Sequence, residues 1–289
     1  AKVRALFKKG DTCNPNNYRS ISILPAISKV FEKLMQMQLT SYFETHGLLC
    51  PGQYGFRSNH STEFAAIELI DRISLNLEQN LTPLTIFIDL SKAFDCLNHE
   101  ILLCGLQTTA LSLIRSYLFN RKQFVETNNC KSETCRITTG VPQGSILGPF
   151  LFLVYLNDFK NASSKFKFIN YADDTTLIST VSSFSLDRST ETINNELLLI
   201  QKWLNLNKLS PNVDKTKLMY FFHPRKYLQL PQISLNGRQI ERVENFNYLG
   251  ILINQHLSWS PHISLISSRI SRVCGVLSKL RHFFTTPNP

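Results

Sequence analysis

One stretch of this sequence decides how the chain folds, and it reads Phe168-Ile169-Asn170-Tyr171-Ala172-Asp173-Asp174-Thr175-Thr176-Leu177-Ile178. Two adjacent carboxylates lie between apolar runs rich in β-branched and aromatic residues, which predicts strand, tight turn and strand with the acids at the turn. Because side chains alternate between the faces of a strand, only one of the two acids can easily point at a shared ligand. Acids are common in turns for local reasons, so this pair alone does not define a site.

A second acid ends an apolar run upstream, in Thr85-Ile86-Phe87-Ile88-Asp89-Leu90-Ser91-Lys92-Ala93-Phe94-Asp95. This run predicts a strand, and residues 93–103 have helix-forming character. A carboxylate at the end of a buried strand is costly unless a counter-charge pairs with it. A divalent cation shared between Asp89 and Asp173 would satisfy both acids, and oxygen ligands suit Mg²⁺. Two such ions about 4 Å apart can stabilise the attacking and the leaving oxygen of a phosphoryl transfer.

A third element lies between the two acids and reads Gly140-Val141-Pro142-Gln143-Gly144-Ser145-Ile146-Leu147-Gly148-Pro149. An apolar, helix-like run over 150–156 follows it. Glycine lets the backbone come close to a ligand, and a helix that begins near a glycine-rich turn can bind an anion. A structural turn and a binding loop both fit this pattern.

In this order the three elements resemble the reverse transcriptase domain of non-LTR retrotransposons of the LINE and jockey kind. Residues 87–95 are similar to motif A of that family, 140–149 to motif B and 171–174 to motif C. Four further blocks extend the resemblance over nearly the whole chain: Asn17-Tyr18-Arg19-Ser20-Ile21-Ser22-Ile23-Leu24, Gln53-Tyr54-Gly55-Phe56-Arg57-Ser58, residues 207–217, and Tyr248-Leu249-Gly250. The last block resembles the primer-grip motif.

The resemblance implies the catalytic groups. Asp89, Asp173 and Asp174 act in catalysis, and together with Leu90 they hold two Mg²⁺ ions, for which Mn²⁺ is a possible substitute. Lys215 acts near the leaving pyrophosphate, with Lys217 as its competitor. Asp95 is interpreted as a structural residue that faces away from the turn. The alternative for Asp174 is a turn acid that orients backbone amides.

The resemblance also implies a nucleotide-binding set, which comprises Arg19, Arg57, Phe94, Gln143 and Gly144. Guanidinium groups form bidentate bonds to phosphate oxygens, and Arg57 follows a Gly-Phe that holds its loop. The ring of Phe94 would clash with a 2′-OH, the group that distinguishes ribonucleotides. Gln143 can donate and accept hydrogen bonds near the pairing site. The alternatives are a core aromatic for Phe94 and solvated surface for the arginines.

The implied activity is that of an RNA-directed DNA polymerase that copies retrotransposon RNA by two-metal nucleotidyl transfer. Its partners are an RNA template, a DNA primer and deoxynucleoside triphosphates. The alternative is a catalytically inactive, truncated remnant that retains only nucleic-acid binding. Two departures from the family bear on this alternative: Ser20 replaces a usual proline, and the segment 101–110 is several residues shorter than normal.

Composition limits the other classes of function. The formal charge of +10 over 289 residues favours a polyanionic partner, and an apolar content of 43% is enough for a core. No run of about 18 apolar residues predicts a membrane span. The seven scattered cysteines indicate reduced thiols, so we expect a nuclear or cytoplasmic protein that is not secreted. Both ends look like cuts through a longer polypeptide, and the family's upstream endonuclease domain is not visible.

Periodicity predicts an α+β fold in which an antiparallel sheet carries the acids and helices cover one face. Helices are expected at 27–45, 61–80, 110–118 and 186–206, and an amphipathic segment at 263–284. Strands are expected at 84–89, 122–127, 134–139, 166–171, 174–180 and 217–222, with a hairpin at 232–240. The resemblance implies the right-hand polymerase architecture: fingers over 1–84, palm over 85–254 with a fingers-side insertion around 105–140, and the truncated start of a thumb over 255–289.

Overall fold

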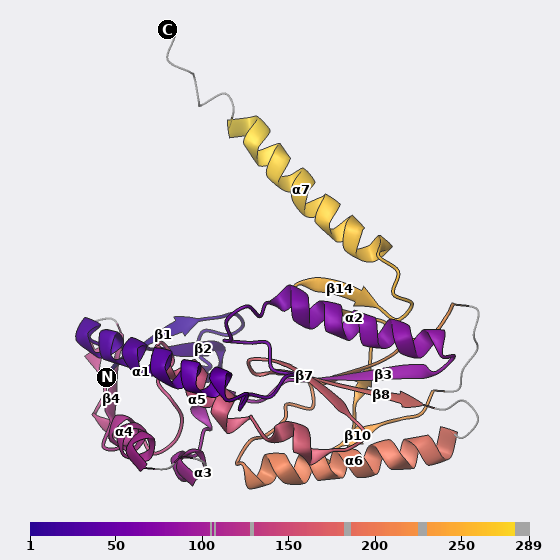
Figure 1. Ribbon diagram of the computed structural model, residues 1–289. Coiled ribbons are helices and arrows are strands. Elements are labelled where there is room, and N and C mark those ends of the chain that lie inside the picture. Colours follow the sequence, from indigo (N-terminus) through magenta and orange to yellow (C-terminus); the bar gives the residue numbers. More distant parts are fainter. Residues whose placement is uncertain (105, 107, 128–129, 182–185, 225–229, 281–289) are drawn as a thin grey trace.

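The computed structural model describes residues 1–104, 106, 108–127, 130–181, 186–224 and 230–280 (Figure 1). Its centre is a five-stranded sheet in the order β12 (Glu241–Arg242), β9 (Lys217–Tyr220), β3 (Thr82–Ile88), β8 (Asp174–Val181) and β7 (Lys167–Tyr171). Strand β3 pairs antiparallel with β8 and with β9, and β8 pairs antiparallel with β7. Strand β12 joins β9 in parallel, so the sheet is mixed and not wholly antiparallel as expected.

Both faces of this sheet are covered, which corrects the expectation of helices on one face. Helices α5 (Leu147–Tyr155) and α6 (Leu186–Leu206) belong to the core on one side, and α2 (Thr62–Glu78) packs on the other. Figure 1 shows α2 and α6 on opposite sides of the sheet. All seven residues of β3 are buried. A run of apolar residues without alternation is typical of a strand covered on both faces, and β3 has this pattern.

A second sheet contains the N-terminal hairpin and a segment far away in the chain. Strands β1 (Lys2–Phe7) and β2 (Tyr18–Ile23) pair antiparallel, and β1 pairs in parallel with β4 (Lys122–Thr127). The short strands β5 (Cys130–Lys131) and β6 (Cys135–Arg136) complete it. Sequence analysis did not predict β1 or β2, and it predicted β6 longer than it is. Helices α1 (Ala26–Thr45), α3 (His99–Cys104) and α4 (Thr108–Leu118) lie near this sheet in Figure 1.

The remaining predicted elements are confirmed with small shifts at their ends, except that residues 281–284 of the predicted amphipathic segment lie outside the described residues. The hairpin of β10 (Ser234–Leu235) and β11 (Arg238–Gln239) turns at Asn236 and Gly237, both with positive φ. A further hairpin joins β13 (Asn245–Tyr248) to β14 (Ile251–Asn254) and covers the same sheet face as α2. Single-turn 3₁₀ helices form at η1 (Pro15–Asn17), η2 (Ala93–Asp95) and η3 (Phe159–Ala162). The expected helical character of 93–103 is therefore divided between η2 and α3.

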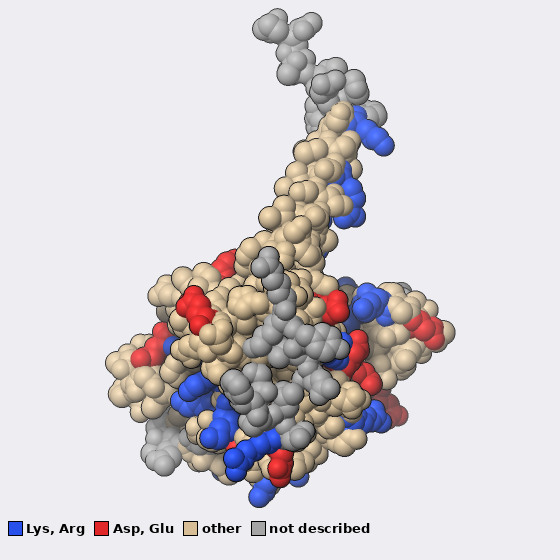
Figure 2. All heavy atoms as spheres, turned by 90° about the vertical axis from the view of Figure 1, so that its right-hand side faces the viewer, with Lys and Arg blue, Asp and Glu red and all other residues tan. Residues whose placement is uncertain are grey.

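Helix α7 (Ser260–Leu280) projects away from the rest of the molecule (Figure 1). Its residues include Arg269, Arg272 and Lys279 but no acid, and Figure 2 shows the basic side chains along one side of the helix. Its apolar side chains recur every three or four residues and are exposed. Among the described helices, none combines the length and the apolar character needed to cross a membrane.

Candidate active site

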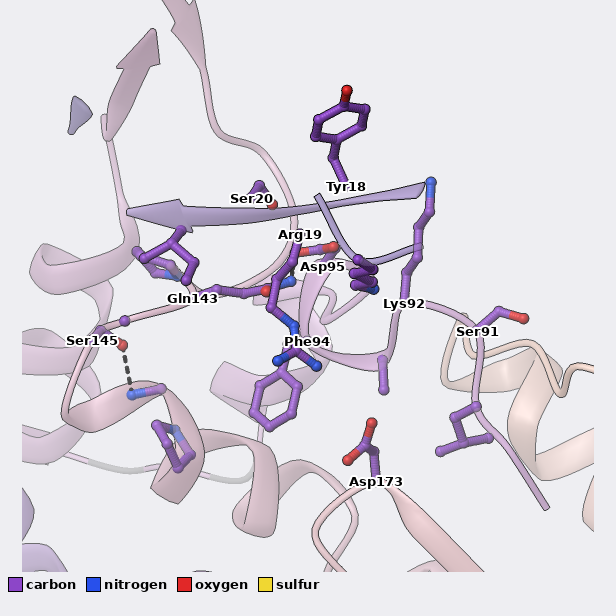
Figure 3. Close-up of a pocket in the computed structure, with 18 of the residues that line it drawn as sticks. Tyr18, Arg19, Ser20, Ser91, Lys92, Phe94, Asp95, Gln143, Ser145 and Asp173 are labelled. Carbon is purple, nitrogen blue, oxygen red and sulfur yellow. Dashed lines mark hydrogen bonds between the residues drawn. The ribbon is translucent and has the colours of Figure 1, made fainter. Parts of the chain in front are cut away.

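The acids from the two sequence blocks meet because β3 and β8 pair antiparallel. Ile88, the last residue of β3, lies opposite Thr175 near the start of β8. Asp89 follows β3 directly, and Asp173 and Asp174 precede Thr175, so the three acids gather at one end of the sheet. Asp89 and Asp173 both line a cavity of about 610 Å³ (Figure 3).

Asp174 is not among the residues that line the cavity shared by Asp89 and Asp173. It lines a second cavity, of about 210 Å³, between β3, β8 and the β13–β14 hairpin. Asp89 and Lys215 line both cavities. The predicted primer-grip residues Tyr248 and Leu249 also line the second cavity. The acids therefore lie at the boundary between two adjoining spaces, one beside the 140–149 loop and one beside the hairpin.

The carboxylates repel one another in a partly desolvated place. Burial raises the pKa of Asp173 above its ordinary value, and the neighbouring Asp89 raises it further. Burial, Asp173 and Asp89 together raise the pKa of Asp174 to about 6. The ammonium of Lys215 lies 3.4 Å from Asp89 Oδ2 and forms an ion pair with this acid. Such a surplus of negative charge favours a bound cation.

The donor set fits Mg²⁺, which usually takes one or two protein carboxylates and completes its shell with water and substrate phosphate. Leu90 has a buried side chain in the core, so it can serve only through its main chain. Within the described ranges, no group of three or more His, Cys, Asp or Glu side chains is arranged to hold a metal. The described residues therefore offer a partial ligand set, which water and a bound phosphate group would complete.

Two phenylalanine rings, those of Phe56 and Phe94, line the first cavity, and the ring of Phe152 packs behind Phe94. Phe94 follows Asp89 by five residues and stacks on Phe152 with ring centroids 4.5 Å apart. Phe56 meets Phe94 edge-on at 6.2 Å. In Figure 3 the guanidinium of Arg19, which comes from β2, points toward Phe94 and Asp173. The predicted residues Arg19, Phe94 and Asp173 thus share one cavity.

Gln143 is oriented by Asp95, which sequence analysis interpreted as a structural residue. Its Nε2 donates to Asp95 Oδ1 at 2.9 Å, and both residues line the first cavity. Asp95, which was expected to be a structural residue that faces away from the turn, contacts the 140–149 loop because η2 turns the chain toward that loop. Gly144 has φ +108, and a Cβ there would lie 2.8 Å from Ser22 O. The loop therefore packs closely on β2, and Ser22 N donates to Gln143 O.

The two lysines of the 207–217 block have different neighbours. Main-chain bonds from Ser91 N to Ser210 O and from Asn212 N to Asp89 O bring this block against the end of β3. Lys215 thereby reaches the acids. Lys217 Nζ instead donates to Glu241 Oε2 at 2.5 Å. The arrangement favours Lys215 over its competitor.

Arg57 does not reach the cavity with the other predicted residues. Its Nη1 donates to the carbonyls of Cys50 (3.1 Å) and Gln53 (3.3 Å), within its own loop. The arginine is not among the residues that line the first cavity. The block over residues 53–58 predicted that Arg57 binds phosphate from a loop. In the structure, its guanidinium instead binds carbonyls of that same loop.

A buried glutamate that sequence analysis did not single out supports the 140–149 loop. Glu32 on α1 is 3% exposed, and its Oε2 accepts from Ile146 N at 2.7 Å and from Leu147 N at 3.3 Å. An acid at the start of a helix satisfies amide groups that have no partner within the helix. Glu32 therefore holds the N-terminal end of α5. One signal was present in the sequence: a lone acid inside an apolar helical run.

Comparisons with known proteins agree with this geometry. The family described as reverse transcriptase (RNA-dependent DNA polymerase) matches residues 7–253, and the chain belongs to that family. Within it, the relatives are mobile-element proteins. The probable RNA-directed DNA polymerase from transposon X-element of Drosophila melanogaster is 28% identical over 89% of this chain. The RNA-directed DNA polymerase from mobile element jockey of Drosophila funebris is 27% identical over 96% of it.

The match covers 29% of the X-element protein and 32% of the jockey protein, so the chain spans less than a third of their length. Among solved structures, a telomerase from Candida albicans in complex with a fragment of telomeric RNA has a TM-score of 0.52 at 14% identity. The similarity covers 89% of this chain and 46% of the telomerase chain. This likeness establishes the right-hand polymerase fold.

Proposed function

We propose that this chain is the polymerase domain of a non-LTR retrotransposon protein and copies RNA into DNA. The observation that carries the proposal is the meeting of Asp89 and Asp173 in one cavity with Phe94, Arg19 and Gln143. The order and spacing of the sequence blocks support the assignment, and so does membership of the family. The substrates are a DNA primer on an RNA template and deoxynucleoside triphosphates.

In the proposed reaction, the 3′-oxygen of the primer forms a bond to the α-phosphorus of the nucleotide. The bond from that phosphorus to the bridging oxygen breaks, pyrophosphate leaves, and the hydroxyl proton passes to solvent. Two divalent cations held by Asp89, Leu90, Asp173 and Asp174 would lower the pKa of the hydroxyl and neutralise the triphosphate charge. Mg²⁺ is the proposed ion, and Mn²⁺ a substitute.

The other residues position the nucleotide. Arg19 binds phosphate oxygens through its guanidinium, which keeps its charge at any relevant pH. The Phe94 ring, backed by Phe152, lies under the sugar and leaves no room for a 2′-OH. Gln143, oriented by Asp95, contacts the nucleotide beside the Gly144 backbone. Lys215 supplies positive charge, or a proton, as pyrophosphate departs.

We further propose that residues 1–84 form the fingers, 85–254 the palm and 255–289 the start of a thumb. Pairing of β1 with β4 supports the assignment of the segment around 105–140 to the fingers side. The basic residues of α7 suit contact with a phosphate backbone. We place this protein in the nucleus or cytoplasm, where its nucleic-acid substrates would be found.

The rival function is that of an inactive remnant that binds nucleic acid. One observation bears on it: the shortened segment 101–110 connects α3 to α4, while the acids lie at the end of the central sheet. Residues 105 and 107 of this segment lie outside the described part of the chain. The intact cavity favours the polymerase.

Primer extension on an RNA template tests the proposal. The chain should extend a DNA primer with deoxynucleotides in Mg²⁺ or Mn²⁺, and Asp173→Asn should reduce extension by orders of magnitude. The same variant should still bind primer–template, with an affinity that falls steeply with salt because phosphate contacts dominate binding. Binding by the wild-type chain without any extension would favour the remnant. Loss of binding in Asp173→Asn would contradict the separation of the catalytic acids from the basic surface.

A further inference from the structure

The loop that contains Arg57 forms an extra edge on the central sheet, beside the catalytic turn. Gln53 forms an isolated parallel bridge with Asn170 of β7. Tyr54 N donates to Asn170 O, and Asn170 N donates to Gly52 O, both at 2.7 Å. The approach is so close that a Cβ on Gly52 would lie 2.4 Å from Phe168 O. The loop therefore runs in direct main-chain contact with the strand that leads to Asp173.

One side chain links this loop to the turn itself. Gln53 is 4% exposed, and its Oε1 accepts from Gly55 N at 2.9 Å and from Ala172 N at 3.3 Å. Ala172 immediately precedes Asp173 and has φ +57, a left-handed conformation that is strained for a residue with a Cβ. A Cβ on Gly55 would lie 2.2 Å from Ala172 N, so only glycine allows this contact. The buried amide oxygen of Gln53 therefore holds the main chain of this strained turn in place.

Two other residues hold the loop without contacting the turn. Arg57 donates to the carbonyls of Cys50 and Gln53. Asn157 Oδ1 accepts from Cys50 N, and its Nδ2 donates to Leu48 O, both at 2.7 Å. These bonds anchor the start of the loop. The chain therefore offers two side-chain amides for comparison: the buried Gln53 reaches the catalytic turn, and the half-buried Asn157 supports the same loop at a distance from it.

We infer that Gln53 is a positioning residue that holds the Asp173 turn against Asp89. Two carboxylates that repel each other move apart unless the backbone that carries them is restrained, and the Gln53 bond to Ala172 N is such a restraint. The inference rests on the proposed function, because it concerns the place of an acid assigned to catalysis. The same inference gives Arg57 a role, because its bonds to the carbonyls of Cys50 and Gln53 stabilise the loop that carries Gln53.

The test compares two variants of the 289-residue chain. Gln53→Met keeps the length of the side chain and removes the acceptor oxygen, whereas Asn157→Leu removes the distant anchor. Gln53→Met should lower kcat for primer extension about tenfold to a hundredfold, since a misplacement of about 1 Å is enough for such a loss. It should also raise several-fold the Mg²⁺ concentration that gives half-maximal thermal stabilisation. Asn157→Leu, compared at a similar loss of Tm, should leave both quantities within about twofold of wild type.

A conservative variant distinguishes the loss of this one hydrogen bond from a general loss of stability. Gln53→Glu retains an acceptor oxygen at the same place and should recover part of the lost Mg²⁺ response. Equal losses in Gln53→Met and Asn157→Leu would reduce Gln53 to an ordinary structural residue and overturn the inference. Failure of the proposed function has a different signature: the wild-type chain would not extend primers, yet its Mg²⁺ stabilisation would still weaken in Gln53→Met.

Discussion

The ammonium of Lys215 lies 3.4 Å from Asp89 Oδ2, where it partly neutralises an acid that is proposed to hold a metal ion. Both groups are partly solvent-exposed, and pairs of this kind contribute about 0.2–1 kcal/mol. A cation that binds Asp89 must displace or outweigh this contact. In the proposed mechanism, Lys215 would therefore compete with the metal before the reaction and would lie beside the triphosphate during it.

Replacing Lys215 should separate these two effects. Lys215→Met should lower the Mg²⁺ concentration for half-maximal thermal stabilisation by up to about fivefold, the equivalent of about 1 kcal/mol. It should also slow single-turnover extension, because positive charge near the leaving pyrophosphate is lost. Lys217→Met is the control, since Lys217 bonds to Glu241. Equal effects of the two substitutions would contradict a specific role for Lys215.

Phe94→Val tests selection of the sugar. The smaller side chain should raise incorporation of ribonucleotides relative to deoxynucleotides by about tenfold or more, because the bulk under the 2′ position is removed. Competition between the two nucleotide types on one template measures the ratio. Phe152→Leu disturbs the same stacked pair from outside the cavity, so it should reduce Tm and leave discrimination unchanged. If discrimination in Phe94→Val equals that of wild type, Phe94 is a core aromatic.

The raised pKa of Asp174 predicts how stability depends on pH in the absence of metal. Folding favours the protonated carboxyl, so the stabilising effect of protonation is present at low pH and is lost as pH rises from about 4 through about 6. Asp174→Asn should therefore be more stable than wild type at pH 7.5 by about 1 kcal/mol, a value reduced for solvent exposure, and should match it near pH 4.

Chemical denaturation in the presence of EDTA measures this difference. Asp71→Asn, an exposed change on α2, should not reproduce its dependence on pH. Saturating Mg²⁺ should reduce or reverse the advantage of Asp174→Asn at pH 7.5, since the wild-type chain would then gain a ligand. A constant difference between pH 4 and 7.5 would show that repulsion among the acids does not destabilise the fold.

The two arginines that the resemblance assigned to nucleotide binding, Arg19 and Arg57, should behave differently. Arg19→Ala should raise the KM for deoxynucleotides about tenfold or more, because a hydrogen bond to a charged group contributes about 1.5–3 kcal/mol. Arg57→Ala should mainly lower Tm, and it should also lower kcat because Arg57 binds the main-chain carbonyl of Gln53 itself, which Asn157 does not. Steady-state extension and thermal melts of both variants measure the contrast. A large KM effect confined to Arg57→Ala would restore the original assignment of Arg57 to triphosphate binding.

Local chemistry in the sequence was sufficient for the long helices, for the central strands β3, β7, β8 and β9, and for placing the acids at the ends of strands. The unbroken apolar run before Asp89 predicted β3, and the paired apolar runs around Asp173 and Asp174 predicted β7 and β8. The dipeptide Asn236-Gly237 marked its hairpin because both residues readily adopt positive φ. The ordered blocks also identified the family, which the comparison over residues 7–253 confirms.

Only the tertiary structure decided which groups share a cavity. The sequence does not show that η2 brings Asp95 to Gln143. It predicts Arg57 as a phosphate ligand, yet in the structure Arg57 binds carbonyls of its own loop. The bonds from Ile146 N to Glu32 and from Ala172 N to Gln53 join residues more than a hundred positions apart, so neither bond can be predicted from the neighbouring sequence. Periodicity reports which face of an element is apolar, but the direction of a single polar side chain depends on the backbone groups that fold against it. Those groups exist as partners only once the strands have paired.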